Sequence, residues 1–110
     1  MMFVEFNVDN TTYKLRLNVR NTISLEKQLG KNPISIFGKG DEIPTITTMV
    51  QILYASLQQY QHGISLDDAF DIFDKWLDEG HAITDFLAVI IDIYKTSGIL
   101  KNDKKSEEKN

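Results

Sequence analysis

Two short strands open the chain, and only helical patterns follow them. The segments FVEFNV and TYKLRLNV alternate apolar and polar residues and are joined by Asp9-Asn10, a pair typical of a two-residue hairpin turn. This turn predicts facing pairs that match in character: Met2 with Leu17, Val4 with Leu15, Glu5 with Lys14, and Phe6 with Tyr13. A slip of one residue would turn the apolar set outward, so the pattern and the turn predict the same register.

The hairpin requires further elements to bury it. A two-stranded sheet is marginally stable in water, so helices must cover its apolar face. The sequence therefore predicts an α+β fold, in which an N-terminal β-hairpin packs on a small bundle of about four helices. With 110 residues, 42% of them hydrophobic, the chain fits a single domain, which we expect over residues 1–100. Residues 101–110, KNDKKSEEKN, have no apolar pattern and predict a disordered polar tail.

Apolar spacing and capping residues predict four helices and one single turn. Asn21 or Thr22 is expected to cap the first helix, which ends at Leu29, before Gly30. Further helices are expected over residues 45–62, 65–79 and 84–97, with a single turn that starts at Asn32-Pro33 and a loop over residues 38–44. The helix that Ser65 and Asp68 cap has an expected buried face of Leu66, Ala69, Phe70, Phe73, Trp76 and Leu77.

The last predicted helix is apolar around most of its circumference. It carries Val89 and Ile93 on a second flank, beyond an expected stripe of Phe86, Leu87, Ile90, Ile91 and Tyr94. It is therefore either the central helix of the domain or a helix whose second flank contacts another chain. Trp76 allows the same two interpretations, because tryptophan is enriched at binding hot spots as well as in cores. The candidate protein-contact residues are Phe86, Val89, Ile93 and Trp76.

Charge and composition exclude several classes of function. A net charge of -4 argues against a nucleic-acid partner, since phosphates attract clustered Lys and Arg. The chain has no cysteine, which excludes disulfides and thiolate metal sites. Its longest apolar stretch, residues 86–91, is far shorter than the roughly 20 residues that span a bilayer, and no leader pattern precedes the first strand. We expect no membrane segment.

The sequence shows no catalytic or metal-binding constellation. The Asp-rich run that starts at Asp67 has Ile72 and Asp78 where an EF-hand loop needs Gly and Glu, so it predicts a solvated helix face. His62 and His81 lie beside glycines at helix ends, without a third nitrogen or sulfur ligand. The serines lie in caps or helices and form no GxSxG turn. We therefore expect no enzyme, no cofactor and no metal.

Three segments together resemble the tail assembly chaperones of long-tailed bacteriophages and prophages of Gram-positive bacteria. They are LEKQLGKNPISIF with the hairpin before it, TMVQILYASLQQYQHGISLDDAFDIFDKWLDEG, and the closing TDFLAVIIDIYKTSGIL. The resemblance covers Met2 to about Leu100 and lies in the pattern of the whole chain, because none of the segments is a catalytic signature. It transfers no binding residue to this chain.

The resemblance implies a non-enzymatic helper, made in the bacterial host cytoplasm and absent from the mature virion. Such proteins bind the long helical tape measure protein, keep it soluble and help to recruit the tail tube protein; short and frameshifted long forms occur, and the polar ending suits the short form. An amphipathic client helix would dock in an apolar groove. Two alternatives stay open, a structural virion protein such as a head-to-tail connector or tail completion subunit, and an accessory or regulatory subunit of an enzyme. The client-binding surface, the formation of a homo-oligomer and pairing through the hairpin edges are left open as well.

Overall fold

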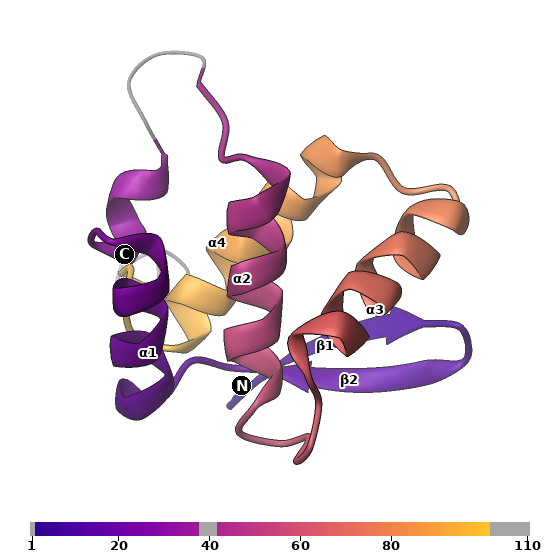
Figure 1. The fold of residues 1–110 in the computed structure, drawn as a ribbon, viewed down its shortest axis with the longest axis horizontal. Coiled ribbons are helices and arrows are strands. Elements are labelled where there is room, and N and C mark those ends of the chain that lie inside the picture. Colours follow the sequence, from indigo (N-terminus) through magenta and orange to yellow (C-terminus); the bar gives the residue numbers. More distant parts are fainter. Residues whose placement is uncertain (1, 38–41, 102–110) are drawn as a thin grey trace, which may run out of the picture.

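The computed structural model describes residues 2–37 and 42–101, which form an α+β fold around one hydrophobic core (Figure 1). Its elements in chain order are β1 (Val4–Val8), β2 (Thr11–Leu15), α1 (Val19–Leu29), the 3₁₀ turn η1 (Pro33–Ile36), α2 (Ile46–Leu57), α3 (Leu66–Asp78), the 3₁₀ turn η2 (Ile83–Asp85) and α4 (Phe86–Thr96). The predicted fold class, a hairpin with four helices, is confirmed. Residues 102–110 of the predicted tail and residues 38–41 of the predicted loop lie outside the described residues.

β1 and β2 pair antiparallel in the predicted register. The predicted pairs that form are Val4 with Leu15, Glu5 with Lys14, and Phe6 with Tyr13. Asp9 and Asn10 both have positive φ angles, 50° and 63°, which is the backbone of a type I′ turn. The predicted pairing of Met2 with Leu17 is wrong, because β1 begins only at Val4 and the side chain of Met2 is exposed.

The outer edge of β2 is closed by α2 and by the turn that follows it. The side-chain amide of Gln61 accepts a hydrogen bond from the N–H of Lys14 at 2.7 Å and donates one to the carbonyl of Lys14 at 2.9 Å, as a neighbouring strand would. Further along the strand, the N–H of Arg16 donates to the carbonyl of Ser56 at 2.9 Å. Since these backbone groups are already bonded, another chain cannot add a strand at this part of the edge.

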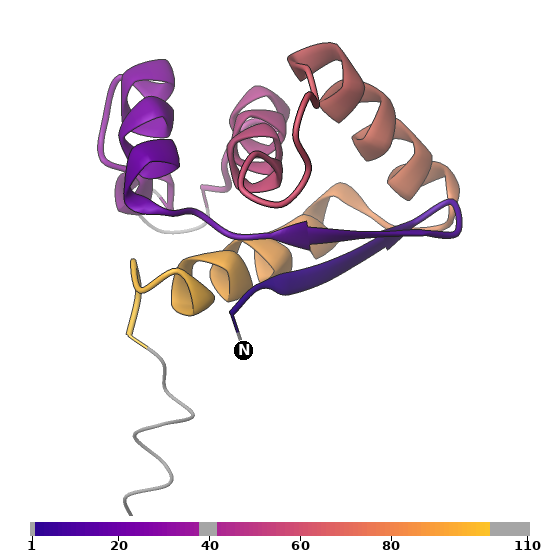
Figure 2. The same cartoon turned by 90° about the horizontal axis from the view of Figure 1, so that it is seen from below.

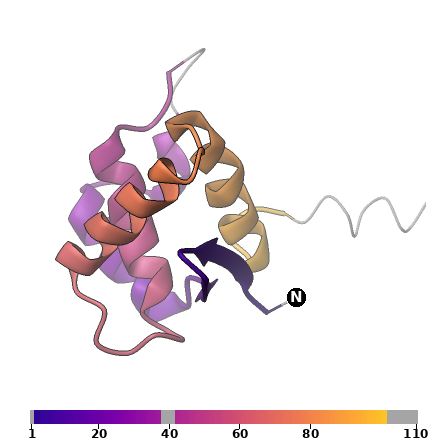
Figure 3. The same cartoon turned by 90° about the vertical axis from the view of Figure 1, so that its right-hand side faces the viewer.

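α2 lies at the centre of the helices. Figure 2 shows α1, α2 and α3 side by side in a row on one side of the hairpin. α4 crosses behind α2 in the view of Figure 1, and Figure 3 shows α4 to the right of the other helices. α2 contacts α1, α3, α4 and β2, and α4 also contacts β1. The contacts with α2 and β1 enclose much of α4. The fully buried side chains of α4 are Phe86, Ile90, Ile93 and Tyr94. The interpretation of the last helix as part of the core is thus confirmed for the flank of Ile93.

An aromatic cluster determines how α3 is rotated. The rings next to Trp76, with centroids 5.4 to 5.9 Å away, belong to Phe6, Phe73 and Phe86. With Trp76 in this place, Ile72 is buried beside it. The predicted buried face is wrong at Leu66 and Phe70, which are 40% and 46% exposed, because the same rotation turns them toward solvent.

Two predicted helix boundaries are confirmed by their capping bonds. Ser65 and Asp68 form the capping box: the N–H of Asp68 donates to the Ser65 hydroxyl at 3.0 Å, and the N–H of Ser65 donates to the Asp68 carboxylate at 2.9 Å. Gly30 ends α1 in the left-handed conformation, with φ 70°. The single turn at Pro33 is also present, capped by the Asn32 side chain.

Two other boundaries differ from the prediction. α1 begins at Val19, and the predicted cap at Asn21 or Thr22 is wrong, because the Asn18 side chain accepts a backbone N–H of the first turn at 2.8 Å and so acts as the cap. α2 ends at Leu57 rather than at residue 62. The chain leaves the helix there, and this is what brings the side chain of Gln61 to the edge of β2.

The side chain of Tyr94, on α4, contacts η1 and links the two elements. Its side chain is fully buried, its hydroxyl donates to the carbonyl of Pro33 at 3.0 Å, and its ring meets that of Phe37 edge-on with centroids 6.0 Å apart. Burial raises the pKa of Tyr94 well above its usual value near 10. The fold therefore requires the neutral hydroxyl.

We expect the stability of the protein to fall as the pH rises above about 10. In that range the unfolded chain releases the Tyr94 proton while the folded chain retains it, so the free energy of unfolding drops by up to about 1.4 kcal/mol per pH unit. Tyr94→Phe should cost about 1 kcal/mol at neutral pH, because the Pro33 carbonyl loses its donor, and should flatten the alkaline slope. Urea unfolding of both proteins across this range measures the effect, and equal slopes would contradict it.

Candidate functional site

Among residues 2–37 and 42–101, no three His, Asp or Glu side chains gather in a way that could hold a metal ion. The same ranges contain no helix with the length and apolar character needed to cross a membrane. His62 is exposed, and His81 stacks on Trp76 with ring centroids 4.3 Å apart.

The four predicted protein-contact residues do not form one surface. Phe86 and Ile93 are fully buried and Trp76 is 4% exposed, so these three belong to the core and the interpretation of them as contact residues is corrected. Each packs against several neighbours, and the ring of Trp76 lies 5.6 Å from that of Phe86. Val89 is half-buried, and a contact through its side chain stays a prediction.

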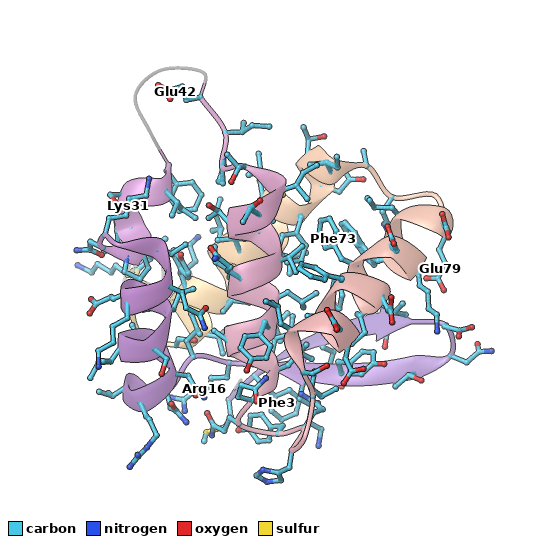
Figure 4. The ribbon with its side chains drawn as sticks, in the orientation of Figure 1. Phe3, Arg16, Lys31, Glu42, Phe73 and Glu79 are labelled. Atoms are coloured by element: carbon cyan, nitrogen blue, oxygen red, sulfur yellow. The ribbon has the colours of Figure 1, made fainter. Side chains whose placement is uncertain are left out.

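A groove lies between the first half of α1 and the chain that follows α4. Its volume is about 500 Å³, and its lining residues are Arg16, Leu17, Asn18, Val19, Thr22, Ile23, Glu26, Ser97, Gly98 and Ile99. Val19 and Ile23, one helical turn apart, are 77% and 46% exposed, which is unusual for side chains of their kind. Figure 4 places Arg16 at the foot of α1, beside this groove.

The floor and far wall of the groove depend on contacts between distant parts of the chain. The N–H of Leu17 donates to the hydroxyl of Ser97 at 2.9 Å, across 80 positions of sequence. Gly98 then takes a positive φ of 82°, and the N–H of Ile99 donates back to the carbonyl of Tyr94 at 2.8 Å. The sequence prediction missed the groove, because only these contacts bring Ile99 opposite α1. In the sequence, the only sign of the groove is the spacing of Val19 and Ile23, which puts two apolar residues one helical turn apart.

α1 and α3 carry opposite charge on their exposed sides. α1 has two basic residues, Arg20 and Lys27, and one acidic residue, Glu26. The acidic side chains of α3 are Asp67, Asp68, Asp71, Asp74 and Asp78. Lys75, the basic residue of α3, lies 3.7 Å from Asp9 at the tip of the hairpin. The solvated acidic face predicted for this segment is confirmed, and it lies on the other side of α2 from the basic α1 (Figure 2).

A family model described as "Family of unknown function (DUF6096)" matches residues 5–110 of the chain. Neither the comparison with curated proteins nor that with solved structures gave a match. The family match spans nearly all of the hairpin, the four helices and both walls of the groove.

Proposed function

We propose that this chain, which belongs to the DUF6096 family, is a non-enzymatic phage tail assembly chaperone that binds a tape measure protein. The proposal joins the resemblance of the sequence to such chaperones with one structural observation, the open apolar groove beside α1. In this role the protein works in the bacterial host cytoplasm, helps to recruit tail tube subunits and stays out of the mature virion.

The groove suits one apolar face of a client helix. Val19 and Ile23 offer two exposed apolar side chains one turn apart on one wall, and Ile99 contributes to the other wall. An amphipathic helix presents apolar residues at the same spacing, so its apolar face can lie along the groove. Binding would cover Val19, the most exposed of the chain's large apolar residues in the described ranges.

We expect Val19→Glu to abolish the solubilisation of a tape measure protein. Co-expression of the chain with the tape measure protein of the same phage or prophage should raise the soluble yield of the client, and the two should purify together. Val19→Glu replaces the most exposed apolar side chain of the groove with a carboxylate, in a groove that already carries Glu26, so both effects should fall at least tenfold. Ile46→Glu is the matched control, since Ile46, like Val19, is an exposed apolar residue at the first position of its helix but lies on α2, away from the groove.

Two outcomes would overturn the proposal. One is a client that stays insoluble and unbound when the unmodified chain is present. The other is a stoichiometric amount of this chain in purified particles, which would favour the alternative of a structural virion protein such as a connector or tail completion subunit. An equal effect of Val19→Glu and Ile46→Glu would instead place the client on another surface.

A further inference from the structure

The exposed side of α1 combines an apolar pair with two basic residues along one flank, while Glu26 lies on the other flank. Ile23 is 46% exposed, and Val19 lies one turn before it. Arg20 and Lys27, three residues before Ile23 and four residues after it, lie on the same exposed side of the helix. We call these four residues the α1 face. Ile23 thus has one cation before it and one after it along the helix, and this arrangement suits a partner that is apolar and acidic.

The exposed side of α3 has the same arrangement with the opposite charge. Phe70 is 46% exposed, and Leu66, one turn before it, is 40% exposed. Asp67 and Asp74, three residues before Phe70 and four residues after it, are both exposed. We call these four residues the α3 face. It therefore presents the apolar and acidic surface that the α1 face suits.

The two faces cannot satisfy one another within a single chain. α1 and α3 lie on either side of α2 (Figure 2), and α2 contacts both. Within residues 2–37 and 42–101, none of the four charges of the two faces takes part in an ion pair. If the two faces pair with each other, the α1 face of one copy must therefore meet the α3 face of another.

We propose that the protein associates with itself, with the α1 face of one copy packed against the α3 face of the next. The contact joins two different surfaces, so a pair of copies keeps one α1 face and one α3 face free for further copies. The assembly grows with concentration as a chain of copies, or closes into a ring if the rotation between neighbours allows it. Opposite charges flanking an apolar centre give the contact both its attraction and its register.

The helical pattern also determines the direction of packing. On both helices, viewed from the N-terminus, the charged residues lie clockwise of the apolar pair. Two helices with this arrangement bring their charged flanks together only when they run antiparallel. Seven residues separate the two charges on each helix, so Arg20 then faces Asp74 and Lys27 faces Asp67, with Ile23 against Phe70 between the two pairs.

Self-association stands independently of the proposed client, although the two share part of α1. Val19 and Ile23 line the groove and also belong to the α1 face. A client in the groove and a neighbouring copy would therefore compete for α1. The oligomeric state of the purified chain alone tests the self-association, without any client.

Two charge-reversed variants give a decisive test. Arg20→Glu with Lys27→Glu makes both faces acidic, and Asp67→Lys with Asp74→Lys makes both basic. Sedimentation velocity over a wide concentration range should show self-association of the unmodified chain that weakens with added salt. Each variant alone should associate at least tenfold more weakly, because like charges meet. An equimolar mixture of the two should associate again, since each copy then finds an oppositely charged partner.

Control variants separate this contact from the effect of net charge. Glu42→Lys with Asp92→Lys changes the net charge as much as Asp67→Lys with Asp74→Lys but alters exposed residues outside both faces, and it should associate like the unmodified chain. Circular dichroism should show that every variant is folded. A chain that stays monomeric at all concentrations would overturn the proposal. A mixture that fails to associate, or variants that associate as strongly as the unmodified chain, would do so as well.

Discussion

Ile93→Glu unfolds the protein, whereas Val89→Glu, one turn earlier on α4, leaves it folded. The side chain of Ile93 is fully buried, and a carboxylate in its place would have to lose its water without a partner. We expect this change to lower the free energy of unfolding by more than about 4 kcal/mol, which is most of the stability of a domain of this size. Val89 is half-buried, so a glutamate there can turn its carboxylate into solvent, and the cost should stay near 1 kcal/mol.

Circular dichroism and thermal unfolding measure the difference between these two variants. Val89→Glu should keep the helical spectrum and a cooperative transition, and Ile93→Glu should show neither at room temperature. Because the two substitutions introduce the same side chain on the same helix, helix propensity cannot explain a difference between them. A folded Ile93→Glu would mean that Ile93 is reachable from the surface, in which case the interpretation of this flank of α4 as a contact surface would return.

Local signals in the sequence predicted most of the secondary structure. Asp9-Asn10 predicted the turn and the strand register, since only a few residue pairs tolerate two successive positive φ angles. Ser65 with Asp68 predicted the start of α3, and Gly30 predicted the end of α1. Each of these features depends on hydrogen bonds within a few residues. Such features can be read from a short window of sequence.

The errors arose where distant residues decide between similar local choices. Phe70 and Ile72 lie on opposite flanks of the core-facing side of α3. Both side chains are apolar, so the sequence of the helix alone is compatible with the burial of either one. The rings of Phe6 and Phe86, which meet Trp76 from other elements, select Ile72. The residues next to Phe70 and Ile72 in the sequence therefore do not determine which of the two is buried.

The candidate site was beyond sequence reasoning for the same reason. The sequence pattern predicts Val19 before the first helix, because Asn21 and Thr22 are also good capping residues and Asn18 is not distinguished from them. The groove needs Ile99 opposite α1, and that position depends on the bond between Leu17 and Ser97 across 80 positions. Three of the four predicted contact residues, Phe86, Val89 and Ile93, lie on α4, which the fold uses for its core.

Trp76→Ala should destabilise the protein far more than Phe70→Ala, although both remove a large aromatic ring from α3. Trp76 is 4% exposed, and its removal leaves a cavity between Phe6 and Phe86, so we expect a loss of about 3–5 kcal/mol in the free energy of unfolding. Phe70 is 46% exposed, and its ring leaves solvent-facing space that water can refill, so its removal should cost about 1 kcal/mol or less.

Urea unfolding followed by circular dichroism measures both values, and fluorescence is unsuitable because Trp76 is the sole tryptophan. The same two variants separate the core from the surface proposed for self-association. Phe70→Ala should weaken association between copies, since Phe70 is the apolar centre of the α3 face, while keeping nearly full stability. Equal losses of stability in the two variants would show that α3 is rotated as the sequence pattern first predicted, with Phe70 buried, and the α3 face would then be unavailable to a second copy.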